Sequence, residues 1–229
     1  MILYLPLLLV LAVASFARWR INHVSAQFKN YILPLRMTGA HAATIMLKDL
    51  GIGGISIVEH NGMITNSFDA KRKQIRLNTR IFKGDTAWAV GVACQQAALV
   101  AFSQQQRKLY LSRVKSIRAT RFFSGFILIL LITLLMLGRI NFPMGIFFLG
   151  LSWLGLASLD FSTRDVESKA ARIAIGWMRK EGLVRTQDDE FAVRSSAMAS
   201  SWSSLTSFFS AFPLFFYQLM PFMGAKPRK

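Results

Sequence analysis

The side chains in this sequence that could bind a metal ion or carry a proton near neutral pH are few. The three histidines, His23, His41 and His60, stand alone, and no two have the i, i+4 spacing that places a pair on one helix face. The single cysteine, Cys94, has no partner for a disulfide or a C-x-x-C metal site. Capping or surface histidines and a helix-packed thiol are the simpler interpretation, so these residues predict no metal and no other cofactor.

Two carboxylates near the C-terminal third, Asp165 and Glu167, are two residues apart and would face different sides of a helix. A solvated, charge-balanced face beside Lys169 and Arg172 explains them more simply than a catalytic pair. No Ser–His–Asp order or G-x-S-x-G elbow occurs, and the glycines at 51–54 lack the G-K-[ST] that completes a phosphate loop. The sequence therefore predicts no catalytic residue of these classes.

A long apolar stretch, residues 85–110, is the element around which the chain is organised. Asp85 can cap a helix there, and the alanine, valine and leucine that follow suit a buried helix. Metalloproteases carry H-E-x-x-H on such a helix, where two histidines bind zinc and the glutamate acts as base. The equivalent positions hold Gln95, Gln96 and Leu99. A carboxamide is a weak zinc ligand, leucine is none, and Gln96 has no titratable group to act as a base.

The charge is distributed unevenly along a strongly basic chain. The net charge is +17, and residues 18–121 contain 17 Lys and Arg but only 4 Asp and Glu. Residues 160–199 contain 7 of each kind and are balanced. A basic segment could bind nucleic acid, but no nucleic-acid motif is present and apolar runs flank the segment. The positive-inside rule for membrane proteins explains the charge better.

Uninterrupted apolar runs predict membrane segments. Residues 2–17 predict an N-terminal anchor, because the positive charge follows the run, whereas a cleaved signal peptide carries it in front. Residues 122–138 and 142–159, joined by the polar turn 139–141, predict a transmembrane hairpin. The aromatic run 202–224 predicts either a fourth span or an interfacial segment.

A small α+β part precedes the central helix. Thr38 is expected to cap a helix that ends at Gly51. Alternating residues predict a strand at 55–59 and a second strand at 74–77, after a polar turn at 69–73. These elements predict an α-helical integral membrane protein with a small cytoplasmic α+β part.

The predicted organisation has five parts. They are an anchor at 1–20, a basic cytoplasmic region at 21–121, a transmembrane hairpin at 122–159, a cytoplasmic helical segment at 160–200, and a C-terminal transmembrane or interfacial segment at 201–229. Within the fourth part, a helix is expected over 165–180 that ends near Gly182.

The order of these features resembles the YugP-like neutral zinc metallopeptidases, small bacterial membrane proteins with a zinc-protease helix between membrane segments. The resemblance covers nearly the whole chain, and no single motif carries it. Besides the anchor and the hairpin, five stretches are similar to motifs of the family. Thr38–Ala43 is similar to T-G-x-x-x-A, Ile64–Ala70 to L-T-D-H-Y-D-P, and Ile75–Asn78 to V-x-L-S. Ala89–Cys94 is similar to A-V-G-V-A-A, and Asp165–Lys169 to E-x-D-A-S. The resemblance implies a zincin-like central helix between transmembrane segments.

The departures from the family fall on its chemistry. Gln95, Gln96 and Leu99 replace the H-E-x-x-H residues, and Ser67 takes the position of the D-H-Y-D-P histidine. Asp165 would correspond to the family's later acidic zinc ligand. These five residues are thus a degenerate former site, with no metal ligand set and no catalytic residue. The resemblance then implies an inactive relative, a pseudoprotease.

The function expected is that of a scaffold, assembly factor or accessory subunit of a membrane protein complex. The expected location is the bacterial inner (cytoplasmic) membrane, crossed several times, with membrane lipids and other integral membrane proteins as partners and no nucleic acid. Two alternatives remain open at this point. One is a membrane peptidase with rearranged metal ligands, and the other is a basic module that binds anionic lipid through residues 18–121.

Overall fold

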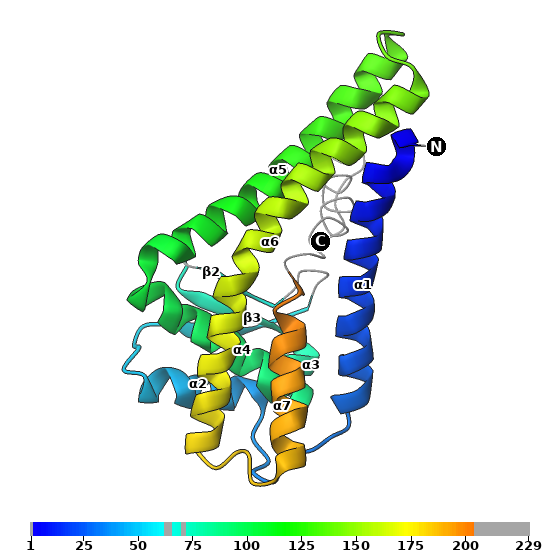
Figure 1. Cartoon of the computed structure of the whole chain (residues 1–229). Coiled ribbons are helices and arrows are strands. Elements are labelled where there is room, and N and C mark those ends of the chain that lie inside the picture. Colours follow the sequence, from blue (N-terminus) through cyan, green and yellow to red (C-terminus); the bar gives the residue numbers. More distant parts are fainter. Residues whose placement is uncertain (1, 62–65, 70–71, 204–229) are drawn as a thin grey trace. The chain divides into compact units, whose positions relative to one another are not determined.

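The computed structural model describes residues 2–61, 66–69 and 72–203, which form a mostly helical chain with one small sheet (Figure 1). They fall into two compact units. The first contains residues 2–18 and 113–163, and the second contains the described residues of 19–112 and 164–203. The predicted C-terminal segment lies outside the described residues from 204 onward.

The first unit is built from parts of three long helices. These are α1 (Leu5–Phe28), which follows a short 3-10 turn at Ile2–Tyr4, α5 (Arg107–Met136) and α6 (Phe142–Lys180). Residues 122–159, predicted as a transmembrane hairpin, form the end of α5, a turn and the start of α6, and their crossing of a membrane stays a prediction. Gly138 has a φ of +63°, a left-handed conformation that ends α5, and the Asn141 side chain caps α6 by accepting the N–H of Met144 at 3.0 Å.

Among the described residues, α1 is the one helix long and apolar enough to cross a membrane, and a signal sequence near the N-terminus would pass the same test. The apolar segments of the hairpin, Phe122–Met136 and Phe142–Ser158, are shorter. Gly150 allows the backbones of α6 and α1 to touch, because an added Cβ would lie 2.5 Å from the backbone nitrogen of Leu7. The small residue at position 150 is thus used for packing within this unit of the chain.

The second unit begins with α2 (Gly39–Asp49), whose N-cap is Thr38 as predicted. The Thr38 hydroxyl accepts the N–H of His41, and Gly51 has a φ of +69° just after the helix. The buried face of α2 consists of Gly39, Ala42, Ala43, Met46 and Leu47. This face packs against the central helix, and its small residues bring the two helices close.

The sheet has three strands, one more than predicted. They are β1 (Ser56–His60), β2 (Ser67–Asp69) and β3 (Gln74–Asn78), in the order β1-β3-β2. β1 pairs with β3 in parallel and β2 pairs with β3 antiparallel. The prediction missed β2 because Asp69, read as the start of a polar turn, instead ends a strand and forms an ion pair with Arg76 at 3.2 Å. A short helix, α3 (Thr79–Phe82), follows β3.

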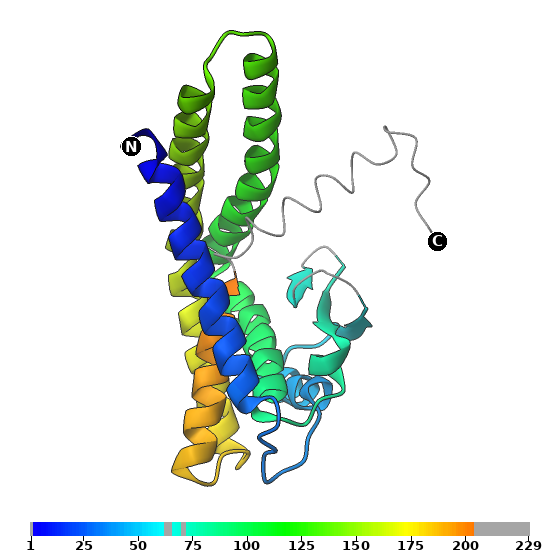
Figure 2. The ribbon, with the colours of Figure 1, turned by 90° about the vertical axis from the view of Figure 1, so that its right-hand side faces the viewer.

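The central helix, α4, spans Ala87–Gln105 and is buried on all sides from Ala89 to Phe102. It lies between α7 on one side and α2 with the sheet on the other (Figure 2). The prediction of one helix over 85–110 capped by Asp85 was wrong at both ends. Thr86 is the N-cap, accepting the N–H of Ala89, and the helix stops where Gln106 leaves helical geometry. A helix without a polar face is a core helix, so its burial follows from its composition.

The remainder of the second unit comes from the end of α6 and from α7 (Gln187–Ser200). The predicted helix over 165–180 is confirmed as the last part of α6, and Gly182 follows with a φ of +68°. Trp177 donates its indole N–H to Asp49 at 2.9 Å, which joins α6 to the end of α2. Sequence analysis did not predict α7, which Thr186 and Asp189 start with a capping box.

Candidate functional site

The positions on α4 that were predicted to correspond to the H-E-x-x-H residues hold a buried network of neutral polar groups. Gln95 is 0% exposed and Gln96 is 4% exposed. The Gln95 side-chain oxygen accepts two hydrogen bonds, one from the Nε2 of Gln96 at 3.0 Å and one from the Ser200 hydroxyl at 2.6 Å. The Nε2 of Gln95 is buried and has no hydrogen-bond partner among the described residues. The network therefore ties α4 to the last residue of α7.

α7 covers the face of α4 that carries Gln95. Gly91 lies one turn before Gln95 on the same face, and an added Cβ there would lie 2.9 Å from the Cβ of Ser196 and 3.2 Å from the carbonyl oxygen of Val193. Only a glycine at position 91 lets the two helices approach this closely. The side of α4 that would present a first histidine ligand is thus in direct contact with a helix.

Two further positions of the predicted former site, Leu99 and Ser67, also lack ligand chemistry. Leu99, one turn beyond Gln95, is buried in the apolar core. Ser67 begins β2, is half-buried, and pairs with Arg76 of β3. β2 lies against α4, so Ser67 belongs to the neighbourhood of the central helix.

Asp165 does not join this network. Its side chain is 70% exposed and pairs with Lys169 one turn later at 2.7 Å, as the simpler interpretation of this region predicted. Glu167, expected to be solvated as well, is instead only 1% exposed. Ala170, Ala171 and Ala174 are fully buried and follow Glu167 at three, four and seven residues. That spacing marks one helix face and could have identified Glu167, rather than Asp165, as the buried acid of α6.

The histidines and the cysteine are not among the residues that hydrogen-bond in the α4 network. His23 is exposed and stacks on Trp19 with ring centroids 5.3 Å apart, and His41 is exposed in the first turn of α2. His60 ends β1. Cys94 is fully buried beside the glutamines, and burial raises the pKa of its thiol far above the usual value. A thiol in this environment stays protonated and is a poor nucleophile.

Sequence reasoning also missed two polar clusters around α7. Trp202, just after the helix, lies against two guanidinium groups, with the Arg164 and Arg20 carbons 3.8 Å and 5.4 Å from the ring centroid. At the other end, the Asp189 carboxylate accepts hydrogen bonds from the Tyr31 hydroxyl at 2.9 Å and from the backbone N–H of Thr186 at 3.0 Å. These contacts hold both ends of α7 in place over α4.

The chain as a whole matches the family described as "Putative neutral zinc metallopeptidase", over residues 2–222. The chain belongs to this family. No curated protein and no solved structure matches it. The resemblance drawn from the order of the sequence features is therefore confirmed at the level of the family.

The residues now present on α4 do not fit the zinc ion that the family name implies. A zinc site of this type needs three protein ligands drawn from imidazole, thiolate or carboxylate. The three positions hold two carboxamides and a leucine, and the one amide oxygen best placed in the network already accepts two hydrogen bonds. No group of three His, Cys, Asp or Glu within the described part of the chain could hold a metal ion.

Proposed function

We propose that this chain is a non-catalytic member of the zinc metallopeptidase family that serves as a scaffold, assembly factor or accessory subunit of a membrane protein complex. The observation that carries the proposal is the replacement of a charged metal centre by a neutral network. Gln95, Gln96 and Ser200 hydrogen-bond to one another in the interior, and α7 packs over them. Amides and hydroxyls bind zinc weakly and do not ionise near neutral pH, so they cannot act as a general base.

The neutral network also explains how the fold persists without a metal. Buried charges need a counter-charge or a metal, whereas a buried amide needs only hydrogen bonds. The Gln95 side-chain oxygen accepts hydrogen bonds from both the other amide and the hydroxyl here. α4 can then serve as a core element that positions α2, the sheet and α7, and leaves their outer surfaces available to partners.

We further propose that the protein crosses the bacterial inner membrane several times, through α1 and the α5–α6 hairpin. Large apolar side chains point outward on both arms of the hairpin. Phe122 and Phe126 on α5 are 68% and 52% exposed, and Phe142 on α6 is 64% exposed. Exposed aromatic and aliphatic surface of this extent is costly in water and is favourable in lipid. Reporter fusions at Asn141 test this: an external location of the hairpin turn supports two spans, and a cytoplasmic location refutes them.

The loss of peptidase chemistry is tested by elemental analysis and proteolysis with the full-length, detergent-purified protein. We expect zinc well below one ion per chain after dialysis against a zinc buffer, and casein hydrolysis equal to that of a Gln95→Ala/Gln96→Ala variant. About one zinc per chain, or wild-type hydrolysis that this variant loses, would overturn the proposal. Such a result would favour a peptidase with rearranged ligands.

A further inference from the structure

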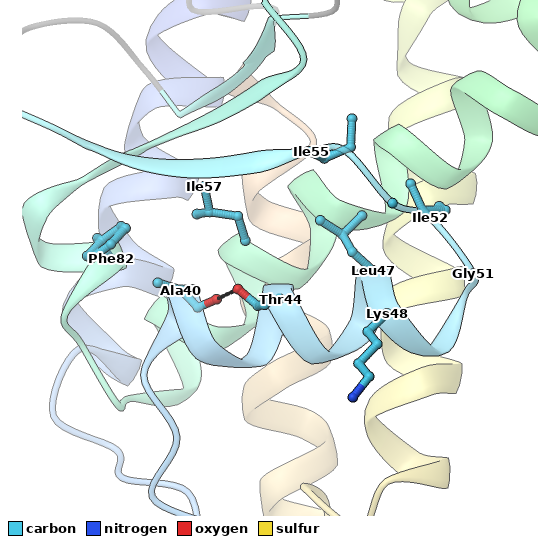
Figure 3. Close-up of a pocket in the computed structure, with 10 residues that line it drawn as sticks. Ala40, Thr44, Leu47, Lys48, Gly51, Ile52, Ile55, Ile57 and Phe82 are labelled. Atoms are coloured by element: carbon cyan, nitrogen blue, oxygen red, sulfur yellow. Dashed lines mark hydrogen bonds between the residues drawn. The ribbon is translucent and has the colours of Figure 1, made fainter.

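A groove runs between α2 and β1, away from the α4 network. It has a volume of about 490 Å³. Its lining comes from α2, from the loop between α2 and β1, from β1 itself and from Phe82 of α3. Figure 3 shows β1 passing over α2, with Ile57 and Leu47 turned into the space between them. No residue of α4 lines the groove, so it is a different site from the former catalytic positions.

Among the described residues, the strand that borders the groove is an edge strand, since the sheet order places β3 on only one side of β1. Ser56 pairs in register with Gln74, and its N–H donates to the carbonyl of Lys73 at 3.0 Å. In a parallel pair, alternate residues point their N–H and C=O to the same neighbour. The backbone groups of Ile57 therefore point to the outer edge, where another strand could pair with them.

The lining combines apolar side chains with a single charge. Leu47 and Ile52 form the buried floor, while Ile55, Ile57 and Phe82 are half-buried and leave part of their surface open. Lys48 is the one ionisable residue among those that line the groove, and it is exposed. The surrounding segment, residues 18–121, is strongly basic. An occupant should therefore be apolar along its length and negatively charged beside Lys48.

The approach to the groove is open at the loop between α2 and β1. Gly53 lines this end, and a Cβ added there would meet no heavy atom within 4 Å. Its φ is not in the left-handed region, in contrast to Gly51 and Gly54. A side chain at position 53 would therefore be accepted by the fold and would project into open space at the mouth of the groove.

From these contacts we infer that the groove binds an extended segment of a partner protein, which adds as a strand to the edge of β1. Alternate apolar side chains of the segment enter the groove, and a carboxylate of the segment meets Lys48. The site goes beyond the proposed loss of peptidase chemistry and does not depend on it, because the groove contains none of the α4 residues.

Fluorescence anisotropy with the full-length, detergent-purified protein tests this inference. The probe is a fluorescein-labelled peptide of three valine–threonine repeats followed by two glutamates, and the comparison probe ends in two lysines. We expect saturable binding of the acidic probe and about 10-fold weaker binding of the basic probe. Lys48 attracts the glutamates of the first probe and repels the lysines of the second, and this difference in charge contact corresponds to about that factor in affinity. Lys48→Glu should reverse the preference between the two probes.

Two matched variants separate the groove from general electrostatics and from misfolding. Lys108→Glu changes an equally exposed lysine that does not line the groove, and should leave acidic-probe binding within about twofold. Gly53→Phe should abolish binding at an unchanged melting temperature, whereas Gly176→Phe, at another open glycine, should not. Absence of saturable binding, or equal losses in Lys48→Glu and Lys108→Glu, would overturn the inference.

Discussion

The contact between α4 and α7 can be tested with two glycines that differ only in their surroundings. Gly91 on α4 and Gly176 on α6 both lie inside helices, so replacing either with alanine gains up to about 1 kcal/mol of helix propensity. A Cβ at Gly176 would meet nothing within 4 Å, but a Cβ at Gly91 would lie 2.9 Å from Ser196 Cβ and 3.2 Å from a backbone carbonyl. Neither neighbour is the end of a flexible side chain, so α7 must shift.

Overpacking of a well-packed interior costs about 1–3 kcal/mol. Gly91→Ala should therefore be destabilised by about 1–3 kcal/mol relative to Gly176→Ala, because the propensity gain is common to both. In a chain of this size, about 1 kcal/mol shifts the melting temperature by roughly 2–4 °C. We expect Gly176→Ala to melt a few degrees above wild type and Gly91→Ala to melt below it.

The measurement is thermal unfolding of both variants in the same detergent, followed by tryptophan fluorescence. Gly91→Val is a third variant for comparison. Its branched side chain would overlap α7 more than alanine does, so its melting temperature should be lower than that of Gly91→Ala. If Gly91→Ala melts as high as Gly176→Ala, α7 does not pack on Gly91 at the distance described. The argument that α7 covers the former catalytic face would then fail.

Three other predictions follow from buried polar groups. Burial raises the pKa of Asp189, but hydrogen bonds from Thr186 and from the Tyr31 hydroxyl outweigh this and hold the pKa below its usual value. The carboxylate therefore stabilises the fold above the unfolded-state pKa, and this contribution is lost as pH falls through the lower folded-state pKa. Asp189→Asn should lower stability by about 1–3 kcal/mol at pH 7 and by less in acid, and a loss that is the same at every pH in chemical denaturation would contradict this. Cys94, buried with a raised thiol pKa, should react with a maleimide only after denaturation, and rapid labelling of the native protein would show that α4 is exposed. Trp177→Phe removes the hydrogen bond to Asp49 while it keeps most of the ring, and should lower the free energy of unfolding by about 1–2 kcal/mol in chemical denaturation. In an Asp49→Ala background the same substitution should cause no further loss, because the hydrogen bond is already absent.

Local signals in the sequence were sufficient where one residue decides the outcome. Thr38 and Gly51 delimit α2 because a hydroxyl cap and a left-handed glycine act within one turn. The turn between α5 and α6 also depends on local signals, because Gly138 adopts a left-handed conformation and Asn141 caps α6. Asp85 and Thr86 are both good caps, and the sequence alone could not separate them, since the choice depends on which residue adopts extended backbone before the first turn.

Features that depend on tertiary contacts could not be predicted in the same way. β2 is a three-residue strand that exists because β3 pairs with it, and α7 is mixed in polarity and gains its order from packing on α4. For the site, residue identity alone shows that Gln95, Gln96 and Leu99 carry no imidazole, thiolate or carboxylate, and the absence of activity stays a prediction. The partner of Gln95 could not be predicted, because Ser200 is far away in sequence and carries no motif.

The hydrogen-bonded glutamines also limit the routes by which single substitutions could build a metal centre on α4. Gln96→Glu alone would place a carboxylate at a position that is 4% exposed, where an uncompensated charge is strongly unfavourable. Gln95→His alone would break the bond to Ser200 without supplying a second ligand, and a histidine at Leu99 would put a polar ring into the apolar core. Each of these single substitutions lowers the stability of the fold without completing a set of metal ligands. Under the proposed non-catalytic role, the neutral amides on α4 would therefore oppose the appearance of a metal centre at every single substitution.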